Sequence, residues 1–295
     1  MPFVASCVMA SGCSMARLGY ENLPMLAAWR ADTYLALNAD QRALTSRRME
    51  TLQAWHRRTQ LDDYQAFLQE VQRRIAAGDV DEAQIRAWRV AAFERWKPIA
   101  EQFAPMAAEV AGTLAPSQIV RMREELGRDN DKMRREWMPT GRADRIETRT
   151  KRYIERAELF LGSLTAEQKQ FARRIAAEAP DTEDVWFAQR LGRQQDLLEV
   201  LERIRVERPD EATATRWMRE HLMRYAQLRD GPDRVGAESS LAAGDAMGAA
   251  MLARATPKQR QHLQRKLQEW IDIVQSLKPT QTATAAEPAT VTATR

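Results

Sequence analysis

Apolar side chains recur at intervals of three and four residues along nearly the whole chain. One such stripe near the C-terminal end consists of Leu263, Leu267, Trp270, Val274 and Leu277. This period matches one face of an α-helix. No segment alternates apolar and polar residues over a run bounded by turn residues, as a half-buried strand would. The spacing therefore predicts an all-α fold, an extended array of antiparallel helical hairpins with no sheet.

The composition supports long helices and excludes several classes of protein. Glycine and proline number only 12 each in 295 residues, below the roughly 7% and 5% of average proteins, so few tight turns are expected. Two cysteines exclude a disulfide scaffold and a four-cysteine metal site. The net charge of +4 lacks the imbalance of a dedicated nucleic-acid binder. We therefore expect no nucleic-acid partner.

A short pattern recurs where helices are expected to begin: an apolar residue, a capping residue, two variable positions and glutamine. Copies occur at 37–41, 80–84 and 164–168, with variants at 114–118 and 255–259. In such a capping box the capping side chain accepts a hydrogen bond from the third helical amide. The glutamine in turn reaches back to the amide of the cap. Each copy therefore predicts the start of a helix.

Together with Pro209-Asp210-Glu211, which lacks the glutamine, the pattern predicts helix starts near residues 37, 80, 114, 164, 209 and 255. In the variant at 114–118 the capping position holds Ala115, so Ser117 is a candidate cap there. This spacing suits a succession of helical hairpins. The alternative is that unrelated helix starts share the same favourable capping chemistry, because the sequences between the copies differ widely.

Two groups of residues carry a resemblance to a known family. They are Arg17-Leu18-Gly19-Tyr20 with Trp55-His56-Arg57-Arg58, and the segment from Lys151 to Gln168. They resemble a family of uncharacterised proteobacterial helical lipoproteins, with a domain of unknown function, over about residues 13–278. The resemblance implies a lipid-bearing cysteine just before the Arg-Leu-Gly-Tyr element, and it implies no activity. Residues 164–168 are also weakly similar to the Leu-Thr-x-x-Gln elements of Spy-like periplasmic chaperones.

The N-terminal stretch is similar to the end of a lipoprotein signal. Ala10-Ser11-Gly12-Cys13 resembles a lipobox, and Ser14 is typical of lipoproteins sorted to the outer membrane. No Lys or Arg precedes Arg17, and the apolar run is shorter than a complete signal. We expect residues 1–12 to be a truncated signal remnant and Cys13 to be the lipid attachment site of an outer-membrane protein facing the periplasm. The alternative is a frayed apolar N-terminus.

The rest of the chain divides into two parts by composition. Residues 13–278 carry the helical pattern and are expected to form one helical domain. Residues 279–295 alternate Thr and Ala with few large apolar side chains, which predicts a disordered tail.

The sequence lacks the motifs of common catalytic sites. It contains no H-E-x-x-H, G-x-S-x-G, P-loop or G-x-G-x-x-G. Its three histidines are far apart, and none has a metal-ligating neighbour at helical spacing. We therefore expect no catalytic residue, metal or cofactor. A hydrolase or other enzyme with an unrecognised helical site is the alternative, which a pocket joining His56 or His221 to two carboxylates would favour.

The clearest candidate for partner binding is an arginine-rich stretch from Arg42 to Arg58 that contains only one acidic residue. The residues expected to contact a partner there are Arg47, Arg48, Trp55, Arg57 and Arg58. Arginine suits an acidic protein client or an anionic envelope component, and tryptophan suits a protein interface. The sequence thus predicts a non-enzymatic envelope lipoprotein that binds such a partner in a chaperone-like or scaffold-like way. A cytoplasmic helical scaffold is a further alternative.

Overall fold

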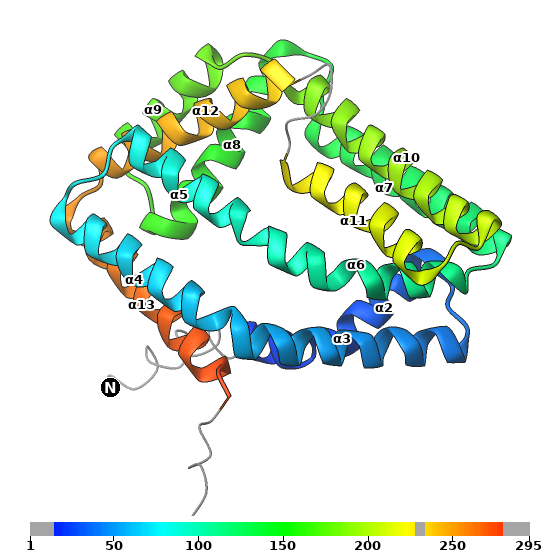
Figure 1. Cartoon of the computed structure of the whole chain (residues 1–295). Coiled ribbons are helices and arrows are strands. Elements are labelled where there is room, and N and C mark those ends of the chain that lie inside the picture. Colours follow the sequence, from blue (N-terminus) through cyan, green and yellow to red (C-terminus); the bar gives the residue numbers. More distant parts are fainter. Residues whose placement is uncertain (1–14, 228–233, 280–295) are drawn as a thin grey trace, which may run out of the picture.

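The computed structural model describes residues 15–227 and 234–279 (Figure 1). Within these ranges every regular element is helical, which confirms the all-α prediction. The predictions for residues 1–14, including lipid attachment at Cys13, and for residues 280–295 lie outside the described residues. No helix in the described ranges combines the length and the apolar character needed to cross a bilayer.

Residues 15–21 form a helical turn that continues past Asn22 into the first labelled helix. The labelled helices are α2 (Leu23–Leu35), α3 (Ala39–Thr59), α4 (Leu61–Ala77), α5 (Glu82–Glu94), α6 (Trp96–Gly112), α7 (Pro116–Trp137), α8 (Arg142–Leu161), α9 (Ala166–Glu178), α10 (Glu183–Glu207), α11 (Glu211–Gln227), α12 (Arg234–Ala253) and α13 (Pro257–Leu277).

All six predicted helix starts are confirmed, at α3, α5, α7, α9, α11 and α13. The side chains that accept a hydrogen bond from the amide three residues later are Asn38, Asp81, Thr165, Asp210 and Thr256. At α7 the cap is Ala115 and no side-chain cap bond forms, so Ser117 does not replace it. Gln118 nevertheless accepts from the Ala115 amide at 2.9 Å. Half of the capping box therefore persists there.

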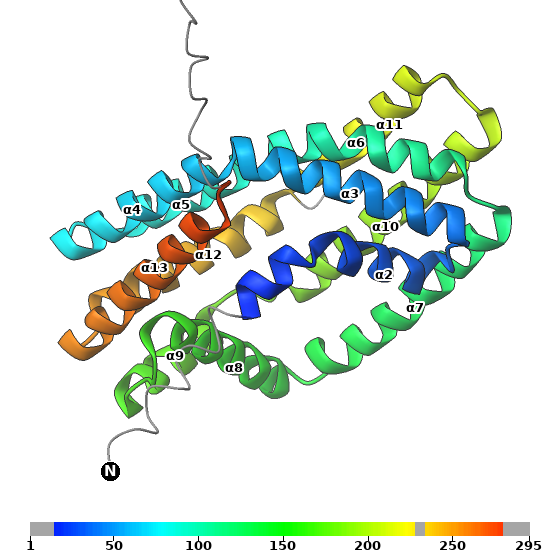
Figure 2. The same cartoon turned by 90° about the horizontal axis from the view of Figure 1, so that it is seen from below.

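Two pairs of consecutive helices form long rods with a break between them. The break between α3 and α4 is at Gln60, and the break between α5 and α6 is at Arg95. Figure 2 shows α4 continuing the line of α3. Later helices return to these rods, since α11 packs along α6, α12 along α5 and α13 along α4. The last three helices thus fold back along the rods formed by α4, α5 and α6.

The buried side chains form two apolar cores. The first joins α2, α6, α7, α10 and α11, and it includes Leu37 and Leu114. The second joins α4, α8, α9, α12 and α13, and it includes Leu164 and Ala255. These four residues are the apolar positions that precede the caps in the recurring pattern. Each core is thus built around two of the predicted helix starts.

The glutamines of these helix starts bind one another. In the second core, Nε2 of Gln168 donates to Oε1 of Gln259 at 2.8 Å, and the reverse bond is 2.9 Å. Gln168 also donates to the Arg254 carbonyl, and Gln259 to the Ser163 carbonyl, both at 2.9 Å. Each amide therefore closes its own capping box and also ties its hairpin loop to the other one.

The first core contains the same arrangement. Gln41 donates to Gln118 at 3.0 Å, and Gln118 donates to Gln41 at 2.9 Å. Gln41 also donates to the Thr113 carbonyl at 2.8 Å, and Gln118 to the Leu35 carbonyl at 2.9 Å. Four of the five glutamine-bearing starts thus meet in two reciprocal pairs, so the pattern joins hairpins as well as starting helices.

Candidate functional site

The arginines of the predicted partner-binding stretch lie on different sides of α3. Arg47 and Arg58 are exposed, and their separation of three helical turns places them on one face. Arg48 instead forms a two-bond ion pair with Glu109 of α6, at 2.5 and 2.9 Å. The guanidinium of Arg57 lies over the ring of Tyr20, 5.3 Å from its centroid. Arg48 is thus exposed but paired with α6, and the Arg57 guanidinium lies against the N-terminal helical turn, whereas Arg47 and Arg58 face solvent.

Trp55, the remaining predicted contact residue, lies beside a small aromatic cluster. Its ring meets that of His56 edge-on, with centroids 6.4 Å apart. The ring nitrogens of His56 lie 2.8 Å from the Tyr20 hydroxyl and 3.4 Å from the Tyr64 hydroxyl. Burial lowers the pKa of His56, because a charged imidazole is poorly solvated there. The cluster fixes the N-terminal helical turn against the end of α3.

We expect His56 to make stability depend on pH. Its pKa is lowered in the folded chain, so its contribution is present above the unfolded pKa of about 6.5 and is lost as pH falls toward the folded pKa. The difference in unfolding free energy between the natural chain and His56→Gln should therefore shrink between pH 7.5 and pH 5. Urea titrations followed by far-UV circular dichroism measure it. A difference that stays constant with pH would contradict this expectation.

A second surface was not predicted from the sequence as a site. Large apolar side chains in the first helical turn and in α2 are exposed, with exposed fractions from 41% to 69%. These side chains belong to Met15, Leu18, Met25, Leu26 and Trp29. Together they form what we call the N-terminal apolar surface. Through Tyr20 this segment contacts His56 and Arg57. This contact places the segment beside the end of α3 that carries His56 and Arg57. The signal prediction covers only the residues before Met15, and no sequence motif singles out the five exposed residues.

The histidines do not assemble the site that would favour the enzymatic alternative. His221 is buried and its Nδ1 lies 2.5 Å from the carboxylate of Asp196, which also pairs with Arg224. His56 contacts two phenol hydroxyls. In the part of the chain that the structure describes, no group of three or more His, Cys, Asp or Glu residues is placed to hold a metal ion.

Comparison with known proteins gives one match. The family described as "Family of unknown function (DUF6279)" matches residues 33–228, from the end of α2 through α11. The matched region contains the whole of the predicted arginine-rich stretch and the first glutamine pair. No curated protein and no solved structure matches the chain. Because the match spans well over half of its length, the chain belongs to DUF6279, a family of unknown function.

Proposed function

We propose that this protein is a non-enzymatic lipoprotein of the bacterial cell envelope, attached to the outer membrane through Cys13 and facing the periplasm. It binds a protein client, in a chaperone-like or scaffold-like way, through the N-terminal apolar surface and the adjoining end of α3. An anionic envelope component is the second class of partner that the exposed arginines would accept.

The exposure of the N-terminal apolar surface is the observation that carries this proposal. Isolated apolar side chains are common on protein surfaces, but a contiguous group of large ones marks an interaction site. Trp29 is a typical anchor of protein interfaces, and the flexible side chains of Met15 and Met25 adapt to varied partners. Arg58, which is exposed at the end of α3, supplies a charge that favours an acidic client. A protein surface with apolar and acidic groups matches this combination best.

Photo-crosslinking in envelope fractions tests the proposal. A crosslinking amino acid at Met25 or Leu26 is expected to capture a discrete protein, and Trp29→Ser should reduce that adduct at least fivefold. Crosslinkers at Val120 and Val206, which are similarly exposed, serve as matched control positions. Purified peptidoglycan and anionic lipid vesicles, added as competitors, identify the alternative partners. Equal adduct patterns from all four positions would refute a client surface.

The anchor is tested separately in the same cells, with the gene in its natural context. Cys13→Ser should move the protein from the membrane fraction to the soluble fraction. Since the binding surface lies outside the anchor, the purified variant should still form the client adduct. Retention of Cys13→Ser in the membrane fraction would contradict lipid attachment at this residue. It would not affect the client surface, which the crosslinking experiment tests independently.

A further inference from the structure

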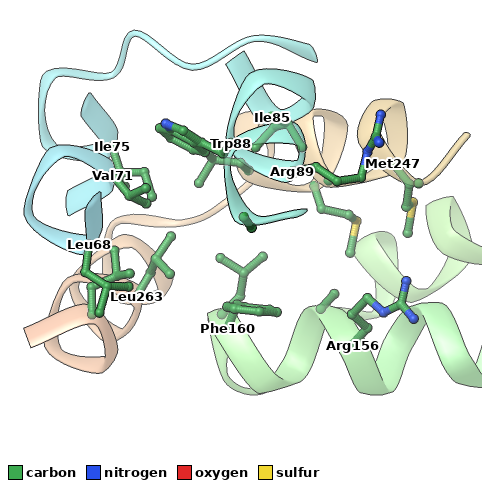
Figure 3. A pocket seen from close by; sticks show the side chains of 18 of the residues that line it. Leu68, Val71, Ile75, Ile85, Trp88, Arg89, Arg156, Phe160, Met247 and Leu263 are labelled. Atoms are coloured by element: carbon green, nitrogen blue, oxygen red, sulfur yellow. The ribbon is translucent and has the colours of Figure 1, made fainter. Parts of the chain in front are cut away.

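Beside the second core lies an apolar cavity of about 420 Å³ that opens to the surface (Figure 3). Its walls come from α4, α5, α8, α12 and α13. Protein interiors are packed closely and rarely leave such space empty. The volume falls within the roughly 300–1,000 Å³ that is typical of small-molecule sites. The cavity is therefore large enough for a ligand.

The lining of this cavity is suited to a hydrocarbon. Nearly all of its exposed surface is apolar, and Trp88, Phe160, Met247, Met251 and Trp270 contribute large or flexible side chains. Burying a hydrocarbon against such a wall removes apolar surface from water at both partners. A strongly polar ligand would find few hydrogen-bonding groups along the same walls.

The two ends of the cavity differ in charge. Figure 3 shows Arg89 and Arg156 with Met247 toward one end, and Leu68 and Leu263 toward the other. Asp245, which is buried, neutralises Arg89 through bonds of 2.7 and 2.8 Å. The charge of Arg89 is thus already satisfied within the protein.

Arg156 differs from Arg89 in having a free charge. It is exposed, and within the described ranges it forms no ion pair. Tyr153, one turn earlier on α8, also lines the cavity, and its hydroxyl forms no hydrogen bond with the described residues. Burial raises the pKa of Tyr153, so at neutral pH this hydroxyl is a hydrogen-bond donor. A cation and a donor are therefore available at one end of an apolar cavity.

We infer that this cavity binds a single acyl chain with an anionic head group. The chain lies among the apolar walls of α4, α5, α12 and α13, and the head group accepts from Arg156 and Tyr153. A neutral long-chain alcohol would fill the walls but leave Arg156 without a partner. A cationic amphiphile would be repelled by Arg156. This inference is independent of the client surface, because none of the residues named for that surface lines the cavity.

Displacement of a fluorescent fatty acid from the full chain tests this site. Saturated fatty acids should bind about fourfold more tightly per added methylene up to palmitate, since each buried methylene contributes about 0.8 kcal/mol. Arg156→Glu should weaken palmitate binding at least tenfold and hexadecanol binding less than threefold. Arg173→Glu on α9, an exposed arginine outside the cavity lining, is the matched control. Equal loss for palmitate and hexadecanol would overturn the assignment of Arg156.

The source of the acyl chain is resolved by comparing palmitate with lysophosphatidylglycerol. Binding of palmitate alone identifies a free fatty acid, and comparable binding of both identifies an acyl chain with any anionic head group. Both results support the inference. Failure of both ligands to displace the probe at millimolar concentration would overturn it.

A second variant tests the cavity without changing its charge. A Cβ atom added at Gly248 of α12 would meet only Ile85, another lining residue, at 3.6 Å, which is an ordinary contact distance. Gly248→Leu should therefore fold normally, because leucine favours helix over glycine, and should weaken palmitate at least tenfold by occupying the cavity. Gly127→Leu on α7, where the space is open, is the control. Unchanged palmitate binding by a folded Gly248→Leu would overturn the cavity as the site.

Discussion

Replacement of Arg149 by leucine is expected to lower the free energy of unfolding by about 3–5 kcal/mol. The Arg149 side chain is only 6% exposed, and it lies where α8 meets the end of α9 and the start of α10. It forms a two-bond ion pair with Glu183 at 2.9 and 3.0 Å and a third bond with Asp181 at 2.7 Å. Leucine would remove all three and leave the buried Glu183 with only the longer contact to Arg152.

The remaining donors of Arg149 bind the backbone. Its Nη1 donates to the carbonyl of Ala176 in the last turn of α9, at 2.9 Å, and to that of Ala179 just after the helix, at 2.8 Å. All five N–H groups of the guanidinium are therefore used. Arg149→Lys keeps the charge but cannot reproduce this forked geometry, so an intermediate loss is expected.

Urea unfolding followed by circular dichroism measures both Arg149 variants. Arg128→Leu is the control, because Arg128 pairs with Glu125 within α7 at the surface and its loss should have little effect. If Arg149→Leu cost no more than Arg128→Leu, the buried network would contribute nothing to stability. The order Arg149→Leu, then Arg149→Lys, then Arg128→Leu, from most to least destabilising, is the expected result.

Arg149 also shows where sequence reasoning reached its limit. The apolar stripe of α8 contains Ile146, Tyr153, Ala157 and Phe160, with a gap after the first residue. The structure fills that gap with the buried Arg149 and Thr150. A charged residue next to an apolar stripe is expected to face solvent. The carboxylate partners of Arg149 lie beyond α9 in the sequence, so no local pattern links them to it. The period could therefore locate the buried face of α8, but it could not identify the ion pair within that face.

The arginine-rich stretch of α3 shows a related limit. Adjacent residues of a helix point about 100° apart, so the two members of the doublets Arg47-Arg48 and Arg57-Arg58 have different neighbours. Which member is held by another helix depends on Glu109 and Tyr20. Those residues are distant in sequence, so a count of arginines predicted the basic segment but not its face.

Helix starts were predicted well because their chemistry is local. The cap, the third amide and the glutamine are all within five residues, so one short pattern contains the whole interaction. Which hairpins meet is a different question, since it depends on contacts between loops far apart in the sequence. The sequence alone therefore could not decide whether the pattern marks a repeated hairpin unit or only shared capping chemistry. That decision required the three-dimensional structure.

The Gln168–Gln259 pair is expected to contribute more stability than two separate capping boxes. Gln168→Ala leaves the Thr165 amide, the Arg254 carbonyl and the Gln259 side chain without their partner in a buried site. Each buried unsatisfied group costs about 1–3 kcal/mol, and we expect the unfolding free energy to fall by about 2–3 kcal/mol. Gln259→Ala should cost a similar amount for the same reason.

A double-mutant cycle separates pairing from capping. If the two glutamines act together, the double variant should lose at least 1 kcal/mol less than the sum of the single losses, because the first substitution already breaks the shared bonds. Gln84→Ala tests a glutamine of the same pattern that belongs to neither pair, and it should be nearly additive with either substitution. Strict additivity of Gln168→Ala and Gln259→Ala would reduce the pattern to local capping.

The same cycle on Gln41 and Gln118 gives the matching comparison in the first core. Gln41 is buried but Gln118 is only half-buried, so water can replace part of what the Gln118 side chain loses. A coupling of the same sign and smaller size is therefore expected. Coupling in both pairs would mean that one five-residue pattern starts each helix and also selects the hairpin against which it packs.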